Sequence, residues 1–359
     1  MPHPSQSRSW PPRLALPLVF AATVLLFLAV EGAASVSLAL EAAHRDAVRA
    51  ERSGGILEQR HCEYDRDLGW MHRPNVAIEG LYEPGTRFTT NSQRLRATRD
   101  YTREVPADRY RVVCLGDSFT MGYGVDDAET FPAQLEANSD RLEVINMGMG
   151  AFGIDQDYLW YLRDGERFET DLLLLLVVLD DFDRMTTNKF SGLFPKPLLD
   201  VRDGDLVVDN VPVPRMFSRE ERAAHGPGPL ARVLRHLSFS RSVAPRISAR
   251  DGGRKRRVTA RLLTDLRDVC RERGQEFGVV YLPMDRRIVR MPERASIVRW
   301  LRDFAAAEEI PFYDLVPRFA EVLPEELTGY FAHDHYSPRG NALIARALRE
   351  IIGRDFLEY

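Results

Sequence analysis

The stretch VVCLGDSFTMGYGV, residues 112–125, decides the fold because an apolar run stops abruptly at Gly-Asp-Ser and a glycine-rich segment follows. A buried strand that ends this way has three interpretations: a phosphate-binding loop, a turn that carries a nucleophile, or an ordinary strand-to-helix connection. A phosphate-binding loop needs a lysine after its last glycine, but Tyr123 follows Gly122. The esterase elbow G-x-S-x-G is also absent, since no glycine stands two residues after Ser118. The rest of the chain must decide between a turn that carries a nucleophile in another way and an ordinary strand-to-helix connection.

Apolar runs of strand length alternate with segments of helical pattern along the chain. The run DLLLLLVVL at 171–179 is apolar throughout, as expected of a central parallel strand covered on both faces. Alternation of this kind predicts a three-layer α/β domain with a parallel sheet. The predicted strands are 111–115, 143–146, 171–179, 277–282 and 311–315, and the predicted helices are 128–137, 155–163, 259–273, 293–308 and 338–352.

Two other segments interrupt or precede this pattern. Residues 184–254 are predicted to be an insertion over one end of the sheet, and KPLLDVRDGDLVVDNVPVP within it predicts a β-hairpin that turns at Asp203-Gly204. Residues 41–107 predict a short linker helix followed by a β-rich extension. We therefore divide the chain into an N-terminal segment at 1–40, this linker and extension, and a domain at 108–359.

The N-terminal segment has the composition of a membrane anchor. Residues 14–30 read LALPLVFAATVLLFLAV without a charge, behind Arg8 and Arg13. A membrane span needs about 20 apolar residues, and GAASVSLAL continues the apolar character, so we expect an uncleaved anchor. A cleaved secretory signal is the alternative, with Gly-Ala-Ala-Ser at 32–35 as its cleavage site. Either way, the positive-inside rule predicts that the bulk of the chain is extracytoplasmic, in the periplasm or on the cell surface.

The composition excludes several other classes of protein. A hydrophobic content of 44% and a charged content of 28% are ordinary for a globular protein with a sizeable core. The net charge is −4 with dispersed basic residues, which gives no footprint for nucleic acid. Cys62, Cys114 and Cys270 fit no metal spacing, and Cys114 is predicted to be a small core residue. We expect no metal and no organic cofactor.

Polar clusters follow the predicted strands or precede the last predicted helix. Ligands of a parallel sheet bind at the carboxyl ends of its strands, so these clusters are expected at one edge. Four clusters at the same edge are hard to explain as independent loops. They are GDS at 116–118, NMGMGAFG at 146–153, DDFD at 180–183 and HDHYSP at 333–338.

These blocks resemble the SGNH, or GDSL-like, hydrolase family. Its first block is a Gly-Asp-Ser turn that carries the nucleophile, and its second is an Asn-x-Gly-rich turn, matched by 146–153. Its last block carries the catalytic histidine before a helix with a glycine a few residues on, matched by His335 and Gly340. The resemblance covers residues 64–352 and implies the three-layer α/β/α, flavodoxin-like fold of that family.

The extension adds to the resemblance. NSQRLR at 91–96 is similar to a segment that precedes the core in bacterial membrane-anchored members of the family, with Arg94 in place of a glycine. The resemblance therefore implies the membrane-anchored type.

The resemblance also implies a catalytic triad. Ser118 would be the nucleophile and His335 the general base that takes its proton. The family's orienting acid stands two or three residues before the histidine, but Ala332 and His333 occupy those positions. Asp334 is the remaining candidate, so its replacement is expected to impair the enzyme strongly. Adjacent side chains usually diverge, which leaves a Ser118–His335 dyad as the alternative.

An oxyanion hole would complete such a site. The backbone N–H groups of Ser118, Gly150 and Ala151 are the candidates, with alanine in place of a family glycine. Asp180 stands where the family has an asparagine donor, and an ionised carboxylate cannot donate a hydrogen bond. Asp117 is expected to hold the turn through backbone N–H groups rather than to move protons.

Two functions follow from the resemblance. The first is a serine esterase, or an acyltransferase, that acts on O-acyl groups, O-acetyl among them, of cell-envelope glycans or small esters. The second is a catalytically weak polysaccharide-binding or O-acyltransferase accessory protein, because Asp180 and the missing acid alter two of the four blocks. The expected partners are the ester or acylated glycan and the membrane, and no nucleic acid.

Overall fold

The computed structural model describes residues 12–52, 60–190, 194–215, 238–285 and 296–357. The chain forms two compact units. One consists of Met1–Ser53 and Ser218–Arg250, and the other of Gly54–Phe217 and Asp251–Tyr359. The predicted sheet lies in the second unit, together with all four polar clusters.

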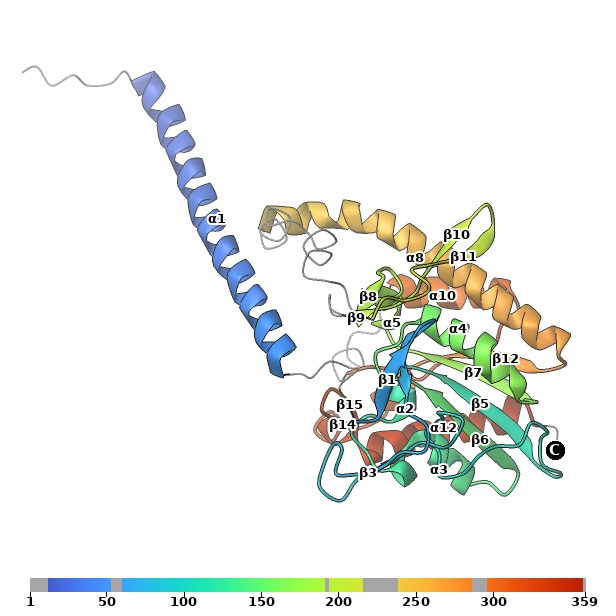
Figure 1. The fold of residues 1–359 in the computed structure, drawn as a ribbon. Coiled ribbons are helices and arrows are strands. Elements are labelled where there is room, and N and C mark those ends of the chain that lie inside the picture. The colour runs from blue at the N-terminus through green and yellow to red at the C-terminus, as the bar shows by residue number, and fades with distance from the viewer. Residues whose placement is uncertain (1–11, 53–59, 191–193, 216–237, 286–295, 358–359) are drawn as a thin grey trace, which may run out of the picture. The chain divides into compact units, whose positions relative to one another are not determined.

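A five-stranded parallel sheet forms the centre of the second unit (Figure 1). Its order β13-β12-β7-β5-β6 is the flavodoxin-like order, so the predicted α/β fold is confirmed. The chain runs outward in both directions from β5, which makes the end of β5 the point where ligands of such sheets bind. The strands are β5 (Tyr110–Gly116), β6 (Leu142–Gly148), β7 (Leu172–Val177), β12 (Glu276–Tyr281) and β13 (Phe312–Asp314).

Helices cover both faces of the sheet because its central strands are apolar on both sides. Along β5, Val113 and Leu115 pack into one core and Val112 and Cys114 into the other. Cys114 is fully buried, as predicted. The first core is closed by α4 (Ile154–Asp164), α8 (Ser238–Glu272) and α10 (Ser296–Ala307), and the second by α3 (Phe131–Ala137) and α12 (Pro338–Asp355).

Two predicted helices differ from those observed. The segment at 128–137 is divided at Thr130, whose hydroxyl accepts a hydrogen bond from Ala133 N and begins α3 after the short helix η2 (Asp127–Glu129). Helix α8 begins at Ser238 rather than at 259. The arginines and lysine at 254–257 favour helix, but Pro245, Gly252 and Gly253 in the same stretch do not, so the early start has no explanation in helix propensity.

The predicted β-rich extension consists of two antiparallel hairpins, β1 (Cys62–Asp65) with β2 (Gly69–His72) and β3 (Ala77–Glu79) with β4 (Arg87–Thr89). Arg96, the last residue of NSQRLR, joins the extension to the loop that follows Ser118. Its buried guanidinium donates to the carbonyls of Met121 (2.9 Å) and Val125 (2.8 Å) and pairs with Asp127 at 3.1 Å. The extension is therefore part of the domain rather than a flexible tether.

The predicted hairpin of the insertion is present. Asp203 and Gly204 have φ of 53° and 94°, as a two-residue turn of mirror-image type requires. Residues 191–193 and 216–237 of the insertion lie outside the described residues.

The shorter elements of the unit are α2 (Ser118–Met121), η3 (Gly165–Arg167), α5 (Asp181–Arg184), β8 (Lys189–Phe190), β9 (Phe194–Pro195), β10 (Leu198–Arg202), β11 (Asp205–Asp209), α11 (Val316–Ala320), η5 (Leu327–Tyr330), β14 (Phe331–Ala332) and β15 (His335–Tyr336).

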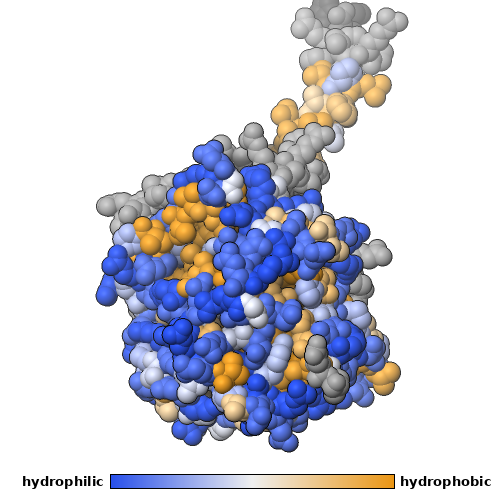
Figure 2. Space-filling model, turned by 90° about the vertical axis from the view of Figure 1, so that its right-hand side faces the viewer, coloured by the Kyte–Doolittle hydropathy of each residue, from blue (hydrophilic) through white to orange (hydrophobic). Residues whose placement is uncertain are grey.

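Helix α1 (Pro12–Arg52) includes both the predicted anchor and part of the predicted linker. Within the described residues, Leu16–Leu38 is the one stretch of helix that is long and apolar enough to cross a membrane. Most of its side chains are exposed, among them Leu16 by 79% and Phe20 by 72%, and Figure 2 shows hydrophobic, orange atoms along this helix. A signal sequence near an N-terminus meets the same criteria of length and composition. The helix therefore shows that an apolar segment is present, and it does not show whether the segment crosses a membrane or in which direction.

Candidate active site

The turn after β5 holds Ser118 at the first position of α2. Asp117 caps this helix, since its carboxylate accepts a hydrogen bond from Phe119 N at 2.8 Å. This is the structural task expected of Asp117. A Cβ at Gly148 would overlap the backbone of Met121, so the glycine lets α2 lie directly against the end of β6. Ser118 is 7% exposed and sits at the carboxyl edge of the sheet.

Ser118 and His335 are brought into hydrogen-bond contact across 217 residues of sequence. Ser118 Oγ lies 2.8 Å from His335 Nε2, and His335 Nδ1 lies 3.0 Å from the carbonyl oxygen of His333. A carbonyl only accepts, so Nδ1 carries the hydrogen and Nε2 presents its lone pair to the serine hydroxyl. This is the tautomer that a general base needs.

The environment of His335 favours the neutral ring. Its imidazole lies between the rings of Phe119 and Tyr123, with centroids 4.6 Å and 4.5 Å away. Burial lowers the pKa of His335, and the hydrogen bond to the His333 carbonyl acts in the opposite direction as the next largest cause. The neutral ring, which can take a proton, is therefore favoured over the imidazolium.

Asp334 does not take the place expected of the orienting acid, because the His333 carbonyl bonds Nδ1. Strands β14 and β15 form a two-residue hairpin in which His333 and Asp334 have φ of 50° and 60°. Both residues therefore lie in the turn, where Asp334 is exposed and makes no hydrogen bond to the ring among the described contacts. Its negative charge raises the pKa of His335 only as a minor contribution, after burial and the other groups.

Gly340, which follows the histidine block, is required for steric reasons. Ser337 caps α12 by accepting a hydrogen bond from Gly340 N at 3.2 Å. A Cβ at Gly340 would overlap the carbonyl oxygen of Tyr330, so only glycine lets the helix begin this close to the hairpin. The spacing from His335 to Gly340 thus sets where the hairpin joins α12.

Arg184, at the end of α5, joins three of the four polar clusters. Its Nη1 donates to Asp117 Oδ2 and Asp181 Oδ1, both at 2.7 Å, and to the carbonyl of Phe152 at 3.0 Å. Burial and the nearby charge of Asp117 raise the pKa of Asp181 well above its ordinary value. Sequence reasoning missed this arginine, although it directly follows the DDFD block.

A second buried group of charges lies behind the first. Lys196 pairs with Asp155, and both side chains are fully buried. Asp157 is also fully buried, and neither of its carboxyl oxygens has a partner. Burial, together with the charges of Asp117 and Asp155, raises the pKa of Asp157 well above its ordinary value, so the neutral carboxyl is favoured. Lys196 comes from the insertion, and no pattern in the sequence paired it with α4.

The candidate oxyanion residues also lie at this edge. Met149 N donates to the carbonyl of Gly116 at 2.9 Å, which ties the second cluster to the first. Trp70 Nε1 donates to the carbonyl of Gly150 at 2.9 Å, and Ala151 has a φ of 66°. Asp180 is half-buried at the start of α5, and burial raises the pKa of its carboxyl. Among the described contacts, its side chain bonds neither Ser118 nor His335.

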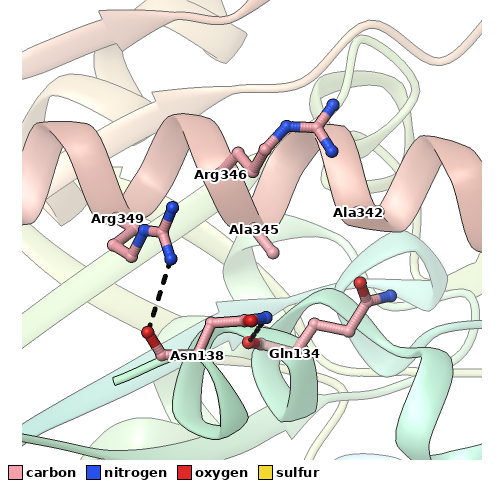
Figure 3. A pocket seen from close by; sticks show the side chains of 6 residues that line it. All are labelled: Gln134, Asn138, Ala342, Ala345, Arg346 and Arg349. Atoms are coloured by element: carbon pink, nitrogen blue, oxygen red, sulfur yellow. Dashed lines mark hydrogen bonds between the residues drawn. The ribbon is translucent and has the colours of Figure 1, made fainter. Parts of the chain in front are cut away.

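A cavity of about 170 Å³ lies elsewhere, between α3 and α12 (Figure 3). Arg349 donates to the carbonyl of Asn138 at 3.4 Å across it. Its lining contains none of the four polar clusters, so it is separate from the Ser118–His335 pair. The lining residues are Gln134, Asn138, Ala342, Ala345, Arg346 and Arg349.

Comparison with known proteins gives similarity at the level of structure. No family model matches the chain, and no curated protein matches it. The chain is similar to a putative lipolytic protein of the G-D-S-L family from Desulfitobacterium hafniense, with 16% identity, a TM-score of 0.39 and coverage of 68% of this chain and 99% of that chain. It is also similar to a lipase/acylhydrolase from Enterococcus faecalis, with 15% identity, a TM-score of 0.35 and coverage of 68% and 96%. An acetyl xylan esterase gives 14% identity, a TM-score of 0.40 and coverage of 67% and 99%.

Proposed function

We propose that the chain is a serine esterase of SGNH type, acting on O-acyl groups of cell-envelope glycans or small esters. The observation that carries the proposal is the 2.8 Å hydrogen bond between Ser118 Oγ and His335 Nε2. It pairs a nucleophile with a base at the switch point of the sheet, where ligands of this fold bind. The resemblance of the sequence blocks supports the same reaction class.

In the proposed mechanism, Ser118 Oγ attacks the carbonyl carbon of the ester while His335 Nε2 takes the hydroxyl proton. The imidazolium that forms donates its Nδ1 hydrogen to the His333 carbonyl, which keeps the ring in position. The ring then returns the proton to the departing alcohol and leaves an acyl-serine. Water, or the hydroxyl of an acceptor, then attacks the acyl carbon while His335 takes its proton. The bond to Ser118 Oγ breaks and His335 returns the proton to Oγ, which gives hydrolysis or acyl transfer and the free serine.

The proposed oxyanion hole uses backbone N–H groups of Ser118, Gly150 and Ala151. The bond from Trp70 to the Gly150 carbonyl supports this role for Ala151. In a trans peptide the C=O and the following N–H point in opposite directions, so a carbonyl held by Trp70 turns the Ala151 N–H away from the indole. Asp180 contributes a donor only when its carboxyl is protonated, and the raised pKa from burial favours that form.

The alternative function is a binding or accessory protein with the same fold and a weak site. The replacement of the family's asparagine donor by Asp180 favours it, because the oxyanion loses one donor whenever that carboxyl is ionised. The two proposals differ in one property, the reactivity of Ser118.

A serine-reactive fluorophosphonate distinguishes the two functions. We expect the full chain to be labelled at Ser118, because the neutral His335 takes the proton as the serine attacks phosphorus. Peptide mapping by mass spectrometry locates the label. A folded chain that stays unlabelled, or is labelled only at another serine, would contradict the esterase proposal and favour the binding protein.

We also propose that Leu16–Leu38 anchors the chain and that the domain lies outside the cytoplasm. Support comes from the exposed apolar helix and from Arg8 and Arg13 before it. Protease added to intact spheroplasts is expected to remove the domain, and α1 is expected to remain with the membrane after a carbonate wash. A domain that stays protected until the membrane is lysed would show that it lies in the cytoplasm, against the proposed topology. A chain that is recovered without α1 and outside the membrane fraction would indicate a cleaved signal.

A further inference from the structure

The loop between β3 and β4 contacts the hairpin that carries His335. Glu83 Oε1 lies 2.8 Å from His333 Nε2, and the two side chains are 50% and 55% exposed. His333 is the residue whose carbonyl accepts the hydrogen bond from His335 Nδ1. Glu83, in the N-terminal extension, thus pairs with His333, the residue whose carbonyl orients the imidazole.

A second contact from the same loop reaches the imidazole through one ring. Tyr82 packs on Tyr123 with centroids 4.5 Å apart, and Tyr123 packs on His335 at the same separation. Tyr123 is thereby held between the extension and the imidazole. Neighbouring residues of one loop therefore act on both the carbonyl partner and the face of the ring.

Backbone hydrogen bonds hold the β3–β4 loop in its conformation. Gly80 N donates to the carbonyl of Thr86 at 2.8 Å, and Thr86 N donates to the carbonyl of Glu83 at 3.1 Å. The hairpin is attached to the loop after α2, because Arg87 N and Thr89 N donate to the carboxylates of Asp126 (2.8 Å) and Asp127 (3.0 Å). Movement of Tyr82 and Glu83 would have to break these bonds.

The hairpin of His335 needs such support. Its two turn residues, His333 and Asp334, both occupy the left-handed region that favours glycine and asparagine. Both are exposed, so the core does not hold them in place. An exposed turn with two left-handed residues is expected to sample other conformations unless side-chain contacts hold it, and a change at His333 would move its carbonyl away from Nδ1.

We propose that Tyr82 and Glu83 are positioning residues for His335, and that the extension completes the catalytic site. Glu83 holds the turn through His333, and Tyr82 holds Tyr123 against the ring. The inference rests on the proposed function, since positioning a base matters only if His335 is one. It assigns a positioning task to a segment that precedes the sheet in the sequence and belongs to the same compact unit.

The expected effect of breaking the Glu83–His333 pair is modest. An exposed pair of this kind stabilises one conformation by a factor of up to about five. Glu83→Ala is therefore expected to lower kcat by about fivefold with KM unchanged, because Ser118 and the binding surface are intact. Glu83→Gln keeps an oxygen acceptor for His333 Nε2 and is expected to stay within about twofold of the wild type.

The matched control is Glu79→Ala. Glu79 lies on the same hairpin, pairs with Arg87 at 3.6 Å and is 73% exposed, so the variant removes the same charge without touching His333. His333→Asn removes the pair from the other side with a residue that tolerates the left-handed region. If the pair acts as one unit, Glu83→Ala and His333→Asn together lower kcat no more than either alone.

The pH titration of His335, followed by NMR of the full chain in detergent micelles, gives a second readout that does not depend on activity. Asp117, Arg184 and Asp334 are the charged groups that act on this ring, and none of these variants alters them. The hydrogen bond to the His333 carbonyl stabilises the imidazolium, so its loss in Glu83→Ala is expected to move the midpoint to lower pH than in the wild type. Glu79→Ala is expected to leave the midpoint unchanged.

The outcomes separate the two proposals. An unchanged kcat and midpoint in Glu83→Ala, or equal changes in Glu79→Ala, would overturn the positioning role. A folded wild-type chain that neither hydrolyses esters nor takes a fluorophosphonate overturns the proposed function instead. The titration then still decides whether Glu83 holds the His335 ring.

Discussion

Ser118→Ala is expected to lower kcat for a short-chain aryl ester by about 10⁶, the loss found when a serine nucleophile is removed from a catalytic triad. The variant removes the only hydroxyl within hydrogen-bond distance of His335 Nε2 among the described contacts. Alanine keeps the helical propensity of the first position of α2, and Asp117 still caps the helix through Phe119 N. The loss should therefore be one of chemistry rather than of folding.

Steady-state kinetics of purified full chain in detergent, with thermal unfolding beside it, measure the effect. Ser139→Ala is the matched control, because Ser139 lies in the turn between α3 and β6, at the opposite edge of the sheet. It is expected to retain wild-type kinetics. A Ser118→Ala chain that kept more than about a tenth of the activity would show that another group attacks the ester, since the loss expected on removing a triad nucleophile is about 10⁶.

The sheet was predictable because its signal is local. DLLLLLVVL is apolar throughout, and in the structure Leu172–Val177 is a central strand buried on both faces. The end of β5 was predictable for the same reason, since the apolar run stops at Gly116. The contact between Ser118 and His335, across 217 residues, was expected from the resemblance of their two blocks to one family. The alternation alone does not place His335, because it lies on β15, outside the five-stranded sheet.

The partner of His335 Nδ1 could not be predicted in this way. Every residue has a carbonyl, so the sequence carries no mark of the one that binds the ring. Its position depends on two left-handed φ angles in a His-Asp turn. Histidine and aspartate tolerate that conformation without requiring it, so the sequence does not mark the turn. The resemblance directed attention to Asp334, a side chain, because family blocks record residue types and not backbone geometry.

The ion pairs were missed for a related reason. Arg184 contacts Asp117 across 67 positions, and Lys196 contacts Asp155 across 41. A charged residue in the sequence is usually a solvated surface group, and only the packed structure shows that Lys196 and Asp155 are fully buried. The pair of Glu83 and His333 is a further case, because nothing in the extension marks one carboxylate as different from its neighbours.

Replacement of His335 is expected to have the second large effect, again about 10⁶ in kcat, because nucleophile and base act as one unit. His335→Ala leaves a gap between the rings of Phe119 and Tyr123, so His335→Gln serves as a second variant that fills more of the space and cannot act as a base. Both are expected to be inactive on the aryl ester while unfolding at a temperature near that of the wild type. A His335→Gln chain with substantial activity would mean that another group takes the serine proton.

Asp334→Asn then decides what orients the base. Loss of the acid of a serine-protease triad lowers kcat by about 10⁴, because the ring adopts the wrong tautomer. Here the His333 carbonyl accepts the hydrogen bond from Nδ1 at 3.0 Å. This acceptor belongs to the backbone, so a substitution of the Asp334 side chain does not remove it. Asp334→Asn also keeps a residue that tolerates the left-handed φ of the turn. We therefore expect it to lose less than about tenfold, through the small contribution of its charge to the pKa of His335. A loss near 10⁴ would instead mean that the Asp334 carboxylate reaches the imidazole during turnover. The site would then be a triad of Ser118, His335 and Asp334 rather than a dyad.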